Sequence, residues 1–126
     1  MVGFEDFVMG EGTPIYQQIV LYLKRGMAGG TIADGDELPS RRVLSALLGV
    51  NPNTIQKAYR ILEDEGLITS RSGAKSYASL TAETAAGLRR ELLLEDVRGL
   101  VSAMKQTGAS KEEALRLFET IWEETP

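Results

Sequence analysis

The sequence of 126 residues predicts a mainly α-helical fold with a small β-hairpin: a winged helix-turn-helix followed by a two-helix dimerisation tail. Three observations predict this fold. Two capped amphipathic segments joined by a glycine turn occupy residues 40–65, a short basic hairpin follows them, and two amphipathic segments end the chain. Because so short a chain holds one small core and an appendage, we expect two domains, residues 1–80 and 81–126.

The first helix is expected after Thr13-Pro14, since proline is favoured at a helix start. Apolar residues at helical spacing then run up to Gly29-Gly30 and predict a buried face: Tyr16, Ile19, Val20, Leu23 and Met27. The preceding residues, 1–12, are too few and too acidic for a signal peptide or a membrane span. We therefore expect a cytoplasmic protein with no membrane contact.

The second helix begins after Ser40, a good N-cap residue, and stops at Gly49. Its apolar residues are expected on one face: Val43, Leu44, Leu47 and Leu48. The basic residues at its start are Arg41 and Arg42. With Ser40, they lie where a helix N-terminus tolerates a phosphate, so we expect all three to contact DNA.

The third helix has Asn51 as its cap and Pro52 at its first position. An apolar stripe is expected to face the core: Ile55, Ala58, Tyr59 and Leu62. A second face carries hydrogen-bond donors and no carboxylate: Asn53, Gln56, Lys57 and Arg60. Asn53, Thr54, Gln56 and Lys57 lie at the N-terminal end, from which a recognition helix reads base edges in the major groove. The alternative is an ordinary solvated helix face.

A short hairpin follows the third helix. Two β-prone runs, residues 67–70 and 76–79, flank a turn signal at Ser72-Gly73, and Arg71 and Lys75 stand beside the tip. Positive charge at the tip of a hairpin that follows a helix-turn-helix is typical of a wing that contacts phosphate. The alternative is a hairpin that only closes a three-helix core.

The segments PIYQQI, GDELPSRR, LLGVNPNTIQKAYRILEDEGLI and SRSGAKSY resemble, in this order and spacing, the DNA-binding domain of the GntR family of bacterial transcription regulators. The resemblance implies phosphate or base contacts for Ser40 and Arg42, places the third helix in the groove, and puts Gly73 at the wing tip. Two positions depart from the family pattern. Lys75 stands where a second glycine is common, and Asp34 stands where a proline is usual.

The last 46 residues predict two helices, about Thr81 to Gln106 and a second one announced by the capping box Ser110-Lys111-Glu112-Glu113. Each has one wide apolar face, for which we expect dimer contacts: Leu93, Val97, Leu100, Met104, Phe118, Ile121 and Trp122. The layout resembles the YtrA-type branch of the family, in which a helical hairpin dimerises and many members are repressors. The alternative is that the two helices pack onto their own DNA-binding domain.

Charge and composition limit the other function classes. The chain carries a net charge of −4, but residues 38–77 hold six basic and three acidic residues, so the charge near the expected DNA contacts is positive. Without cysteine or histidine, the common catalytic nucleophile, general base and metal ligands are missing, and we expect neither an enzyme nor a cofactor or metal site. The expected partners are an operator in double-stranded DNA and a second copy, with a small-molecule effector left open. The rival function is a winged-helix protein-interaction or antitoxin-like module.

Overall fold

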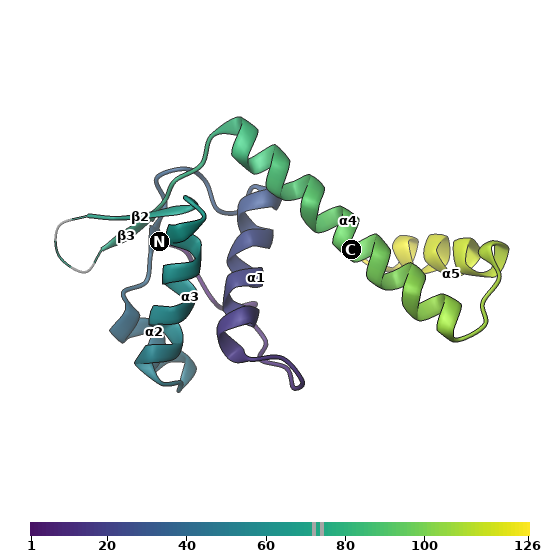
Figure 1. Ribbon diagram of the computed structural model, residues 1–126, viewed down its shortest axis with the longest axis horizontal. Coiled ribbons are helices and arrows are strands. Elements are labelled where there is room, and N and C mark those ends of the chain that lie inside the picture. The colour runs from purple at the N-terminus through teal and green to yellow at the C-terminus, as the bar shows by residue number, and fades with distance from the viewer. Residues whose placement is uncertain (72, 74) are drawn as a thin grey trace. The chain divides into compact units, whose positions relative to one another are not determined.

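The computed structural model describes residues 1–71, 73 and 75–126 (Figure 1). Its elements in chain order are α1 (Ile15–Gly29), β1 (Glu37–Leu38), α2 (Arg41–Leu48), α3 (Pro52–Asp64), β2 (Ile68–Ser70), β3 (Ser76–Ala78), α4 (Ala82–Gln106) and α5 (Lys111–Glu124). The predicted mainly helical fold with a small hairpin is confirmed. The chain divides into two compact units, residues 1–89 and 90–126, and the division falls inside α4. The expected domain limit at residue 80 stays a prediction.

The core of the first unit forms where α3 packs against both α1 and α2 (Figure 1). The apolar stripes predicted for α1 and α3 face this core. They supply its central buried side chains: Ile19, Val20, Leu23, Met27, Ile55, Ala58, Tyr59 and Leu62. Tyr16, which the sequence assigned to the α1 stripe, is only partly buried.

The prediction for the buried face of α2 was wrong at two positions. Val43 is 57% exposed and Leu47 is 65% exposed. The inward face is instead formed by the buried or partly buried residues of the helix, which recur every three or four positions, about one helical turn. They are Arg41, Leu44, Ser45 and Leu48. Two of these are polar, and each makes a hydrogen bond: Ser45 donates to the Val50 carbonyl and Arg41 Nη2 donates to a carboxylate of α3, while Arg41 Nε is buried without a partner among the described residues. Polar side chains can occupy a core face when such partners satisfy them.

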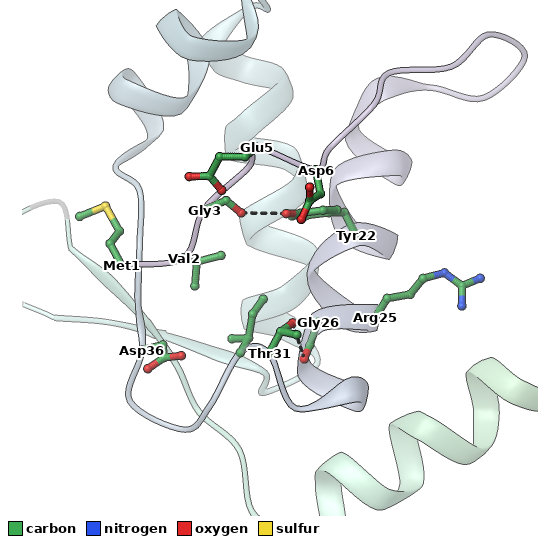
Figure 2. A pocket seen from close by; sticks show the side chains of 11 residues that line it. Met1, Val2, Gly3, Glu5, Asp6, Tyr22, Arg25, Gly26, Thr31 and Asp36 are labelled. Carbon is green, nitrogen blue, oxygen red and sulfur yellow. Dashed lines mark hydrogen bonds between the residues drawn. The ribbon is translucent and has the colours of Figure 1, made fainter. Parts of the chain in front are cut away.

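The N-terminal segment, for which the sequence predicted no structure, completes the core. Val2 and Phe4 are buried, and the Val2 amide donates to the Glu37 carbonyl at 2.8 Å. The rings of Phe4, Phe7 and Tyr22 form a cluster with centroid separations of 4.9 to 5.6 Å. The Tyr22 hydroxyl donates to the Gly3 carbonyl at 2.8 Å (Figure 2). These contacts fix residues 2–7 against α1 and β1.

A hollow of about 530 Å³ lies beside this N-terminal segment, with Tyr22 and Thr31 among its lining residues (Figure 2). Several of the polar groups at its wall form hydrogen bonds within the fold. Thr31 donates to the Gly26 carbonyl at 3.3 Å, and Asp36 accepts from the Ala33 amide at 2.8 Å. Burial, and then the carboxylates of Asp6 and Glu5, raise the pKa of the Tyr22 hydroxyl, which keeps it a neutral donor.

The hairpin predicted from the sequence forms between β2 and β3, and the structure adds β1 on the other side of β3. The resulting antiparallel sheet has the order β1-β3-β2, with Tyr77 opposite both Glu37 and Thr69. Strand β1 has only two residues, which is too short for a period-two pattern to appear in the sequence.

The turn of the hairpin closes around Gly73, whose φ is 77°. Ser72, which with Gly73 formed the predicted turn signal, and Ala74 lie outside the described residues. The Arg71 amide donates to the Lys75 carbonyl at 2.9 Å. Lys75 has no positive φ, so its backbone does not need the glycine that is common in the family.

Asp34, the other departure from the family pattern, has a local role. Its Oδ1 accepts from the Leu80 amide at 2.7 Å, so it satisfies a backbone donor just before α4. A proline at this position has no such acceptor.

Helix α4 begins and ends where the sequence predicted, and α5 begins where it predicted. Thr81 caps α4 by accepting from the Thr84 amide at 3.0 Å, and Gly108, with φ of 83°, follows the end of that helix. Ser110 caps α5 by accepting from the Glu113 amide at 3.1 Å. Within the described residues, none of the helices combines the length and the apolar character that crossing a bilayer requires.

Candidate nucleic-acid interface

Helix α3 separates its polar face from its buried face as the sequence predicted. Asn51 caps the helix by accepting from the Asn53 amide at 2.8 Å, and Pro52 occupies the first position. The predicted polar side chains are exposed along the helix: Asn53, Gln56, Lys57 and Arg60. Thr54 is partly buried at the first turn. Between residues 53 and 60 this exposed face presents amides and cations without a carboxylate, the side-chain set that suits base edges and phosphates.

The start of α2 presents Arg42 to solvent, and the Ser40 hydroxyl caps the helix by accepting from the Val43 amide at 3.2 Å. In the part of the chain that the structure describes, Arg42 forms no ion pair. Its charge is therefore available to an external anion.

Arg41, which the sequence placed with the DNA contacts, has intramolecular partners. Its Nη2 lies 3.0 Å from Glu63 Oε1, its guanidinium lies 5.4 Å from the centre of the Tyr59 ring, and only 25% of its side chain is exposed. Ser70 also donates to Glu63, at 3.1 Å. The contacts to Tyr59 and Glu63 place the start of α2 beside the C-terminal half of α3. Glu63 thus joins α2, α3 and the wing.

Tyr59 anchors the same junction from inside the core. It is fully buried, and its hydroxyl donates to the Pro39 carbonyl at 2.6 Å. Burial raises the pKa of Tyr59 far above its ordinary value, and the Arg41 guanidinium offsets this only in part. The hydroxyl therefore stays protonated and keeps its hydrogen bond to the residue before Ser40.

Two further basic residues of the predicted interface lie over tyrosine rings. Lys57 Nζ is 4.0 Å from the centre of the Tyr16 ring on α1, and the Arg71 guanidinium is 4.7 Å from that of Tyr77 on β3. Sequence reasoning missed both tyrosines, because each ring belongs to a different element from the cation that it meets. At the wing, Arg71, Gly73 and Lys75 are all exposed.

Two of the three acidic residues at the end of α3 are paired with cations of other helices, while Asp64 is exposed one turn after Arg60. Glu63 binds Arg41, and Glu65 Oε1 lies 2.7 Å from Lys24 Nζ on α1. These carboxylates balance charge at the joints between helices. Among the described residues, no group of three or more histidine, cysteine, aspartate or glutamate side chains is arranged to hold a metal ion.

The comparisons with known proteins agree with this architecture. Residues 15–77 match the family model described as bacterial regulatory proteins, gntR family. An uncharacterized HTH-type transcriptional regulator, YhcF of Bacillus subtilis, is 36% identical over 110 residues, which cover 87% of this chain and 91% of YhcF. The HTH-type transcriptional repressor YtrA of Bacillus subtilis is 44% identical over 72 residues, 57% of this chain and 55% of YtrA.

A solved structure shares the fold over most of its length. The GntR family transcriptional regulator from Listeria monocytogenes is 31% identical, with a TM-score of 0.78 over 89% of this chain and 98% of that one. Together with the winged-helix geometry and the exposed polar face of α3, these similarities establish that the chain belongs to the GntR family and is a transcription regulator with a DNA-binding domain.

Proposed function

We propose that this protein is a homodimeric repressor that binds an inverted-repeat operator in the cytoplasm. The observation that carries the proposal is the exposed face of α3 over residues 53–60, which is rich in donors and free of carboxylates. A recognition helix with this face discriminates bases through its amides and cations, whereas a protein-docking helix is expected to expose apolar residues there.

In the proposed complex, Asn53 and Gln56 meet base edges in the major groove, with Thr54 at the first turn. The remaining contacts go to phosphate: Ser40, Arg42, Lys57, Arg71, Gly73 and Lys75. Arg41 is left out of these direct contacts, because its guanidinium already binds Glu63. We assign Arg41 the role of holding the start of α2 in place.

The apolar surface of the second unit supports a dimer. The exposed apolar side chains of α4 and α5 include the residues that the sequence predicted at the interface: Leu93, Val97, Leu100, Phe118, Ile121 and Trp122. Met104 is partly buried, and it lines, with Leu100 and Phe118, a hollow of about 320 Å³ between the two helices. Large exposed apolar patches mark association sites. A second copy has the same surface, and a two-fold dimer presents two recognition helices to paired half-sites.

Repression is proposed from similarity to the Bacillus subtilis repressor YtrA, which matches 57% of this chain. Bound at an operator that overlaps a promoter, a dimer represses by excluding the polymerase. We propose no effector, cofactor or metal for this function.

Binding-site selection from random duplexes with the full-length protein tests the proposal. The expected result is an inverted repeat whose half-sites are separated by about one helical turn of DNA. The triple variant Asn53→Ala, Gln56→Ala and Lys57→Ala is the matched control and should select no sequence. Arg98→Ala, a change outside the proposed DNA contacts, should select the same repeat as the wild type. Selection of no sequence by the wild-type protein would favour the protein-interaction or antitoxin-like alternative. Selection of a single half-site would overturn the dimeric mode of binding.

A further inference from the structure

Tyr16 on α1 lies outside the elements that carry the proposed DNA contacts, yet its ring touches one of them. Lys57 Nζ is 4.0 Å from the centre of that ring. Eight residues further along the chain from each of these, Lys24 of α1 binds Glu65, the C-cap residue of α3, at 2.7 Å. The two contacts show that α1 and α3 run side by side in the same direction, so the start of α1 lies beside the recognition half of α3 (Figure 1).

The contact orients the Lys57 ammonium without neutralising it. A cation over an aromatic face is attracted by the ring quadrupole, and the ring carries no net charge. In the described part of the chain, Lys57 has no carboxylate within ion-pair distance. Arg41 differs in this respect, because Glu63 cancels its charge. Lys57 therefore keeps its full attraction for a phosphate while its side chain is held in one place.

Holding a lysine in place matters because its side chain is among the most flexible. Ordering a long side chain on binding reduces affinity, and a side chain ordered before binding avoids that loss. The Tyr16 ring is partly buried, which restricts its motion independently of its hydroxyl.

We infer that Tyr16 is a positioning residue of the DNA interface: its ring holds the Lys57 ammonium on the α1 side of the recognition helix, ready for a backbone phosphate at the edge of the major groove. The inference rests on the proposed DNA-binding function. It assigns Lys57 to anchoring, while the neighbouring Asn53 and Gln56 read bases.

The test is a double-mutant cycle in the full-length protein, with the duplex recovered by binding-site selection as the probe. Tyr16→Leu should weaken binding by about two- to five-fold for each half-site, the range that an exposed cation–π contact supplies. Tyr16→Phe keeps the ring and should bind like the wild type. In the Lys57→Ala background, Tyr16→Leu should have no further effect. Tyr77→Leu, which removes the ring under Arg71, serves as the matched control and should act independently of Lys57.

Thermal unfolding of each variant separates positioning from stability. An equal loss of affinity from Tyr16→Leu with and without Lys57 would show that the tyrosine acts through the fold, and it would overturn the inference. Tighter binding by Tyr16→Leu would also overturn it, because the ring would then be withholding Lys57 from DNA. If the wild-type protein selects no sequence, the proposed function fails and the inference fails with it. A wild-type protein that binds while the cycle shows no coupling refutes the inference alone.

Discussion

The two compact units of this chain bury their apolar residues very differently. Every buried apolar side chain in the described residues belongs to the unit of residues 1–89. The unit of residues 90–126 has none: Leu92 and Met104 are partly buried, and its other large apolar side chains are 42% to 68% exposed. Burying one such side chain contributes about 1.5–3 kcal/mol. The first unit therefore has a core of its own, whereas the second leaves most of its large apolar side chains exposed, as the proposed dimer requires.

The largest expected effect follows from removing the second unit. A chain ending at Arg89 keeps every buried apolar residue, including Leu88, and should unfold as cooperatively as the full chain. Its affinity for the operator should fall by about 10²- to 10⁴-fold, since each half-site is then bound separately. Gel shifts and thermal unfolding measure the two quantities. If the truncated chain bound the operator as tightly as the full chain, the proposed role of the second unit in DNA binding would be wrong.

Trp122 probes the same comparison with one residue. It is 68% exposed and stacks on Phe118, with 5.7 Å between the ring centroids. We expect a second copy to cover it, so that Trp122→Ala weakens the dimer by about 3–5 kcal/mol. Trp122→Phe, which keeps an aromatic ring, should have a smaller effect. Sedimentation gives the dissociation constant, and as the single tryptophan it should shift its emission to shorter wavelength on dimerisation. An unchanged constant with water-exposed emission would leave α4 as the main contact.

Replacing one leucine in each unit compares how much each unit's apolar residues contribute to the free energy of unfolding. Leu62 is fully buried in α3, and Leu117 is 50% exposed in α5. Leu62→Ala should lower the free energy of unfolding by about 2–5 kcal/mol, because it leaves a cavity. Leu117→Ala should leave the unfolding of the first unit unchanged and weaken only the dimer. Denaturant unfolding at several protein concentrations separates the two effects, and equal destabilisation by both changes would contradict the contrast.

The smallest expected effects on DNA binding distinguish residues that recognise bases from residues that bind phosphates within the first unit. Gln56→Ala and Asn53→Ala should each lose about 1–3 kcal/mol at particular base pairs and relax the sequence preference. Arg42→Ala and Lys75→Ala should weaken binding to all sequences and reduce the salt dependence by about one released counterion each. Repeating the binding-site selection with each variant makes the measurement. If Gln56→Ala selected the wild-type operator, the orientation assigned to α3 in the groove would be wrong.

The N-terminal segment and β1 were the parts of the fold that sequence reasoning did not anticipate. Phe4 and Phe7 had no periodic pattern around them, and their burial depends on Tyr22, which lies fifteen or more residues away. Likewise, β1 is a strand because its two residues meet β3, nearly forty residues later. Neither feature has a local signal, since each exists only when distant segments meet.

The sequence by itself determined the elements whose causes lie within a few residues. The caps at Ser40, Asn51 and Ser110 accept from amides two or three residues ahead. Helical spacing separated the buried stripe of α3 from its polar face, because that spacing is a property of the backbone alone. The candidate DNA interface could be predicted for the same reason.

Only the tertiary structure decided which side chains of that interface are engaged elsewhere. The sequence treated Arg41 and Arg42 as equivalent, yet Arg41 points inward to Glu63, 22 residues away, and Arg42 faces solvent. It placed Val43 and Leu47 in the core, whereas Ser45 took that side by bonding to the Val50 carbonyl. Hydrophobicity alone does not fix the inward face of a short helix, because a polar side chain with a buried partner can replace an apolar one at that face.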